Sequence, residues 1–167
     1  MKKIYDIKFD CINTEYEKHK NQNNMNNCSG YLIKDEVDNI FYGFVKNINS
    51  PFNDSSFIIG NTDKDKLNII KLSNKAINFP ILFNTKVDTV KDDEILSNGK
   101  FSIVFGDEIL LFGNCNISQK VNNNLNVDDV EKQIDRYLSI VGHNSVNYYT
   151  DYLNSLNNEY TKTKKLK

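Results

Sequence analysis

The first pattern along the chain is an alternation of apolar and charged residues near the N-terminus. Apolar side chains occupy every second position from Tyr5 to Cys11, and Asp6, Lys8 and Asp10 lie between them. A period of two places alternate side chains on opposite faces of a β-strand. The pattern therefore predicts a half-buried strand.

Further short strands are predicted between polar segments. Residues 18–29 have no apolar periodicity and are rich in Asn, so we expect an exposed loop there. Strands are predicted over residues 30–34, 40–46, 56–60, 67–72, 77–83, 85–90, 94–97, 100–105 and 109–113. Pro80 cannot donate a hydrogen bond to a sheet, so its strand is expected at an edge or at a bulge.

The pair Asn98-Gly99 is the strongest turn signal in the sequence. Both residues adopt positive φ angles readily, which a tight type I′ hairpin turn requires. The pair lies between the predicted strands 94–97 and 100–105. We therefore expect a hairpin turn at this pair and another reversal of the chain at residues 106–108.

The apolar period changes to that of a helix after the polar linker at residues 121–124. Asn126 can cap a first helix, with Asp128 and Asp129 in its first turn, and Gly142 can end it. A second helix can begin at Asn144 or Ser145. Apolar residues at helical spacing are Val127, Val130, Ile134, Tyr137, Leu138 and Val141 in the first helix, and Val146, Tyr149, Leu153, Leu156 and Tyr160 in the second.

These elements predict an α+β fold in one domain that spans residues 1–167. About eight antiparallel strands within residues 1–120 form a meander, as a curled sheet or a small barrel. A C-terminal helical hairpin over residues 126–160 covers its open side. Residues 161–167 are expected to be a flexible tail.

Charge and apolar patterning argue against nucleic acids and membranes as partners. The 21 basic and 22 acidic residues give a formal net charge of −1, so no excess positive charge attracts a phosphate backbone. No apolar run approaches the roughly 18 residues needed to span a bilayer. The N-terminal residues lack the unbroken apolar segment of a secretory signal. We therefore expect a cytoplasmic location, in the producing cell or in a host cell.

The residue composition is typical of a protein from an AT-rich genome. Asn occurs 27 times, and Arg136 is the only arginine among the 21 basic residues. Arginine normally supplies the bidentate grip on phosphates, carboxylates and guanine edges. Its scarcity weakens the case for chemistry that depends on such a grip.

Motifs for catalysis, metal binding or nucleotide binding are not found in the sequence. The seven glycines never occur as GxGxxG or GxxxxGK, the phosphate-binding patterns. Cys11, Cys28 and Cys115 have no CxxC spacing, and only His19 and His143 could supply imidazoles. No catalytic residue, metal or cofactor is therefore assigned. Whether Cys115 and His143 lie close together is left open.

Part of the sequence resembles the ToxN/AbiQ endoribonuclease toxins. The shared features are a predicted hairpin that runs into Ser50-Pro51 and the Asn-x-Pro at residues 78–80. Basic residues that hold RNA follow the Ser-Pro in those toxins, whereas Phe-Asn-Asp follows it here. We therefore do not assign the family, and a small nuclease-like enzyme stays one hypothesis among three.

The leading hypothesis is a non-catalytic binding protein that occludes a protein partner. Inhibitors, immunity proteins and counter-defence proteins of phages, mobile elements or AT-rich pathogens act in this way. Abundant Tyr and Asn suit polar protein interfaces. The alternative is a small β-barrel that binds an apolar ligand, with the 10 Phe and 9 Tyr residues lining a cavity. An open interior would favour the ligand, and a filled core would favour the protein partner.

Three aromatic residues are the candidate binding residues. Tyr148 and Tyr152 lie four positions apart on the flank of the second helix's apolar stripe, which they widen beyond the usual arc of about 100°. If exposed, they could anchor an interface. A sheet that curls around the helix would bury them instead. Phe52 follows Pro51 in a segment that separates two predicted hairpins.

Overall fold

The structure is a computed structural model that describes residues 1–13, 27–47, 55–73, 80–105 and 108–165. Side chains are described in the same ranges except at residues 12–13, 73, 103–112 and 156–165. Most of the predicted loop at 18–29 lies outside the described residues, and so does Phe52. Residues 28 and 29 of that predicted loop begin a strand instead.

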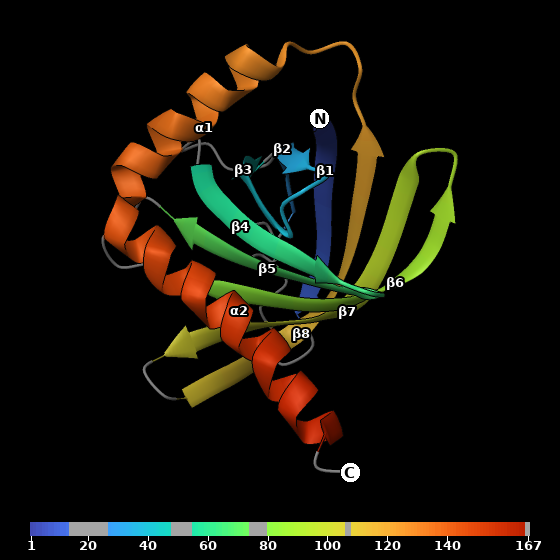
Figure 1. Ribbon diagram of the computed structural model, residues 1–167, viewed down its shortest axis with the longest axis vertical. Coiled ribbons are helices and arrows are strands. Elements are labelled where there is room, and N and C mark those ends of the chain that lie inside the picture. The colour runs from blue at the N-terminus through green and yellow to red at the C-terminus, as the bar shows by residue number, and fades with distance from the viewer. Residues whose placement is uncertain (14–26, 48–54, 74–79, 106–107, 166–167) are drawn as a thin grey trace.

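Eight antiparallel strands form a closed barrel in which each strand pairs with its neighbour along the chain (Figure 1). β1 also pairs with β8, which closes the sheet. The predicted α+β fold is confirmed, and the sheet is a barrel. The strands are β1 (Lys2–Asn13), β2 (Cys28–Asp35), β3 (Ile40–Asn47), β4 (Ser55–Asp63), β5 (Lys66–Ser73), β6 (Ile81–Lys91), β7 (Glu94–Phe105) and β8 (Glu108–Val121).

The barrel interior is an apolar core built from alternate residues of the strands. The predicted inward face of β1, from Tyr5 to Cys11, contributes to this core. The Phe9 and Phe83 rings meet within this core, with their centroids 4.6 Å apart. The buried members are Ile7, Phe9, Cys11, Cys28, Leu32, Phe41, Val45, Ile58, Leu67, Ile69, Phe83, Phe101, Cys115 and Ile117.

A second apolar layer lies outside the barrel, between its wall and the two helices. The helices are α1 (Val127–Val141) and α2 (His143–Lys165), and they run along one side of the barrel (Figure 1). β4 is buried on both faces, because Ile58 points into the barrel while Phe57 and Ile59 point toward the helices. The helices are thus held by apolar residues on the outer face of the strands.

The predicted helix signals are confirmed. The Asn126 side chain accepts hydrogen bonds from the backbone N–H groups of Asp128 and Asp129, at 2.8 and 3.3 Å. Gly142 has a φ of 89° and donates its N–H to the Leu138 carbonyl oxygen. α2 begins at His143 and continues to Lys165, past the predicted end at residue 160. Among the described residues, no helix is both long and apolar enough to span a membrane.

The predicted turn at Asn98-Gly99 is wrong, because β7 continues straight through this pair. Gly99 pairs with Thr85 of β6 and Cys115 of β8, and a Cβ there would overlap the carbonyl oxygen of Asn84. Close approach of the neighbouring strand therefore explains the glycine.

The reversal between β6 and β7 lies at Asp92 and Asp93, with φ angles of 49° and 65°. Two consecutive positive φ angles are the signature of a type I′ turn. Two further predictions are corrected by the observed strand bounds. Residues 94–97 and 100–105, predicted as two strands, belong to the single strand β7. Pro80 immediately precedes β6 and does not lie within a strand.

Replacing Asp93 by Gly should stabilise the protein, because glycine adopts a positive φ without the steric cost that Asp93 bears. We expect the free energy of unfolding to rise by about 0.5 kcal/mol or more, measured by urea denaturation. Asn98→Thr should leave it unchanged or raise it slightly, because Asn98 is an exposed strand residue. A large loss of stability on Asn98→Thr would contradict the observed position of the turn.

Candidate functional site

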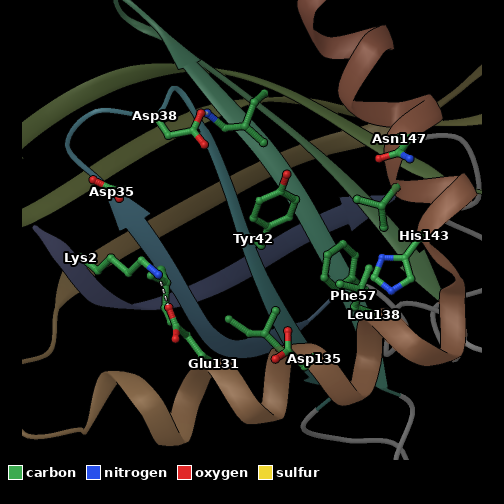
Figure 2. Close-up of a pocket in the computed structure, with 14 residues that line it drawn as sticks. Lys2, Asp35, Asp38, Tyr42, Phe57, Glu131, Asp135, Leu138, His143 and Asn147 are labelled. Carbon is green, nitrogen blue, oxygen red and sulfur yellow. Dashed lines mark hydrogen bonds and ion pairs between the residues drawn. The ribbon is translucent and has the colours of Figure 1, made fainter.

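A groove of about 670 Å³ lies between the outer wall of the barrel and the helices (Figure 2). Strands β2 to β4 and the start of β1 form one wall, and α1 and the first turns of α2 form the other. Tyr42 stands near the centre of the view, with Asp135 below it and His143 and Asn147 on the α2 side (Figure 2). The apolar lining residues are Ile33, Ile40, Tyr42, Phe57, Ile134, Leu138 and Val146.

The rim of the groove is acidic. Among the lining residues, the four carboxylates of Asp35, Asp38, Glu131 and Asp135 outnumber the one ammonium group of Lys2, which gives the lining a net charge of −3 with His143 neutral. The N-terminal ammonium of Met1, outside the lining, also pairs with Asp35 at 3.7 Å. Lys2 donates to Glu131 across 2.5 Å (Figure 2). That hydrogen bond and the charge of Glu131 raise the pKa of Lys2.

Two of the carboxylates also shape the turn between β2 and β3. The Asp35 carboxylate accepts a hydrogen bond from the Val37 N–H at 3.2 Å, and the Asp38 carboxylate accepts one from the Ile40 N–H at 3.1 Å. Such local bonds fix a tight turn. Asp135 instead projects from the surface of α1, one turn beyond Glu131. The turn and the helix thus bring negative charge to opposite sides of an apolar floor.

The structure separates Cys115 from His143. Cys115 lies in the core inside the barrel, whereas His143 lines the groove outside it. Cys115 is paired instead with Cys11 on the neighbouring strand. A hydrogen bond with Cys115 and burial raise the pKa of Cys11 well above its usual range. No cluster of three potential metal ligands occurs in the described part of the chain.

The predicted binding tyrosines differ in their surroundings. Tyr148 is 66% exposed, and its ring meets the Tyr149 ring edge-on with the centroids 5.1 Å apart. Tyr152 is partly buried and packs against the apolar layer beneath the helices. The two tyrosines therefore do not form one exposed flank. Neither lines the groove, and Phe52 lies outside the described residues.

Sequence reasoning did not identify the groove, because its charged residues come from segments far apart in the chain. One signal was present in the sequence. β3 carries apolar side chains at the consecutive positions 40, 41 and 42 and again at 44 and 45. A strand that is apolar on both faces must be covered on both. That requirement could have indicated that the helices lie over this part of the barrel.

A second hollow, of about 230 Å³, lies at the mouth of the barrel. Lys34 enters it from β2, with its Nζ 4.7 Å from the centroid of the Tyr5 ring and 5.1 Å from that of Phe41. Burial lowers the pKa of Lys34 from 10.5 to about 8. Asp35 and Asp38 line this hollow as well as the groove, so the β2–β3 turn separates the two.

The lowered pKa of Lys34 should appear in the pH dependence of stability. Between about pH 8 and pH 10.5 the unfolded chain binds more protons at this residue than the folded chain, so stability should rise with pH across this window. At pH 7 this shift corresponds to a loss of stability of about 3 kcal/mol.

Lys34→Met should therefore stabilise the protein by up to about 3 kcal/mol at pH 7, and the gain should vanish by about pH 10.5. Denaturation curves at a series of pH values test this, with Lys100→Met, at an exposed site, as the control. A loss of stability on Lys34→Met at pH 7 would contradict the predicted cost of burying the amine.

Single substitutions should separate the roles of the two tyrosines. Tyr148→Ala should change the free energy of unfolding by less than about 0.5 kcal/mol, because the side chain is largely exposed. Tyr152→Ala should lower it by about 2 kcal/mol through lost packing beneath the helix. Chemical denaturation measures both, and equal effects would contradict the different surroundings of the two rings.

Comparisons with known proteins give no family for this chain. No protein-family model matches the sequence, and no curated protein matches it. The function is therefore inferred from the geometry and charge of the groove.

Proposed function

We propose that this protein is a non-catalytic binding protein whose groove receives a segment of a protein partner. That segment carries basic side chains beside apolar ones. The observation that supports the proposal is the composition of the groove, an apolar floor bordered by four carboxylates and one lysine. Apolar contact and charge complementarity together favour an amphipathic basic segment over a neutral or acidic one.

The packing inside the barrel supports a protein partner over an apolar ligand held there. Large side chains from the strands meet in the interior, among them Phe9, Phe83 and Phe101. The larger described hollow lies outside the barrel, between secondary structure elements, and is open to solvent. Such a groove can accept several consecutive side chains of a partner segment, as helix-in-groove recognition requires.

The two parts of the groove have different roles in this proposal. Burial of partner side chains against residues such as Tyr42 and Phe57 supplies affinity, at roughly 25 cal/mol per Å² of apolar surface. The carboxylates at the rim supply selectivity and a faster encounter with a basic partner. Because Asp135 is exposed, its contribution should weaken as salt concentration rises.

Occlusion is the mode of action we propose. A partner whose basic and apolar segment lies in the groove cannot use that segment elsewhere, for example to bind an acidic surface or a phosphate. Inhibitors, immunity proteins and counter-defence proteins act in this way. Tyr148 lies on the exposed surface of α2, close in sequence to the groove residue Asn147, and is a candidate for additional contacts.

An array of 12-residue peptides with systematically varied charge and apolar content tests the proposal. The labelled protein should bind peptides that combine at least two Lys or Arg residues with apolar residues. Asp135→Lys should weaken this binding at least tenfold, because it places a cation at the rim of the groove. Asp88→Lys makes the same charge change at an exposed site on β6, outside the groove lining, and should change binding less than twofold.

Two results would overturn the proposed function. One is binding that does not depend on peptide charge or on Asp135. The other is the absence of peptide binding together with saturable binding of a cationic amphiphile, dodecyltrimethylammonium, which would assign the groove to a small ligand. Circular dichroism of each variant checks that the fold is retained.

A further inference from the structure

Lys34 differs from an ordinary surface lysine in its position. The inward face of β2 carries Cys28 and Leu32 into the barrel core, and Lys34 is the next inward residue of that alternation. The side chain therefore leaves the strand at the open end of the barrel interior. Its amine lies over the rings of Tyr5 and Phe41.

Among the described residues, no carboxylate offsets the burial of this amine. Desolvation is the sole cause of its lowered pKa, which is about 8. Lys2 differs, because it donates a hydrogen bond to the Glu131 carboxylate, which raises its pKa. Lys71 also points toward the core, and its Nζ donates to the Cys28 Sγ at 3.4 Å. Lys34 thus combines partial burial, aromatic contacts and a hollow of about 230 Å³ beside it.

The hollow has room for a small molecule of a few non-hydrogen atoms. The groups that face it include the Tyr5 and Phe41 rings and the Thr62 side chain. Its other titratable groups are the ammonium of Lys3, the phenol of Tyr5 and the carboxylates of Asp35, Glu36 and Asp38. The three carboxylates face two lysines, and the N-terminal ammonium of Met1 pairs with Asp35 at 3.7 Å, so the hollow has no excess positive charge to attract an anion.

We propose that Lys34 is a covalent binding site for small uncharged aldehydes or ketones. The lone pair of the neutral amine attacks the carbonyl carbon, a C–N bond forms, and the carbonyl oxygen takes up a proton to become a hydroxyl. Loss of that hydroxyl with a proton as water then gives an imine. One amine and one carbonyl compound thus yield one imine and one water, with no change in oxidation state.

The surroundings of Lys34 favour both the reaction and its product. An amine with a pKa near 8 is neutral in about a tenth of molecules at pH 7, against less than a thousandth for an exposed lysine. When the imine is protonated, its positive charge lies over the same two ring faces that contact the ammonium. Lys34, Tyr5 and Phe41 lie outside the groove lining, so this site does not depend on the proposed partner.

Reductive trapping tests this inference on the intact protein. The folded chain is treated at pH 7.5 with propanal and sodium cyanoborohydride, which reduces an imine to a stable propyl amine. Peptide mapping by mass spectrometry then gives the initial labelling rate at each lysine. Lys34 should be labelled at least ten times faster than the exposed Lys100 and Lys120. The ratio should fall to about one in 6 M guanidinium chloride, where the fold is lost.

Variants and a second reagent make the test specific. Lys34→Arg keeps the charge and should remove the fast site, whereas Lys3→Arg, in the lining of the same hollow, should retain it. With glyoxylate, an anionic aldehyde, the rate ratio of Lys34 to Lys100 should be at least fivefold lower than with propanal. Labelling of Lys34 no faster than that of Lys100 by propanal would overturn the proposal, and an equal ratio with glyoxylate would overturn the class of ligand.

Discussion

The apolar outer face of the barrel determines where the helices and the groove lie. A small closed barrel fills its interior with alternate side chains and normally presents polar residues outside. Here Phe57 and Ile59 of β4 and Phe44 of β3 also carry apolar surface outward. The helical hairpin covers that surface, and the Phe44 ring stacks on Tyr137 of α1 with the centroids 4.9 Å apart. The groove is the part of the apolar wall that the two helices leave open to solvent.

Local signals in the sequence predicted much of the fold. The alternation in β1, the Asn126 cap and the Gly142 stop each depend on neighbouring residues, and the structure confirms them. Closure of the barrel depends instead on pairing of β1 with β8, more than 100 residues away. The Asn98-Gly99 signal failed for a related reason. Gly99 is required by the close approach of the β6 backbone, and the residues next to it in the sequence carry no information on that approach.

The candidate site was harder to predict than the fold. The groove joins Lys2, Asp35 and Glu131 from three distant segments, and each of them is an ordinary surface residue when considered alone. The sequence showed that Tyr148 and Tyr152 lie beside the apolar stripe of the second helix and are not needed to form it. Their different exposures follow from how the helix lies on the barrel, which helical periodicity does not specify. Lys34 gave no sequence signal either, because its burial comes from rings on β1 and β3.

We propose that a basic, apolar partner segment binds in the opening between the helices and the barrel. Backbone amide NMR shifts, recorded while a basic and apolar peptide is titrated into the ¹⁵N-labelled protein, test it most directly. We expect the largest changes at the groove residues Tyr42, Asp135 and Asn147, and small changes at Lys86 and Asn116 on the far strands. Changes concentrated on the far strands, or spread evenly over the surface, would contradict the account.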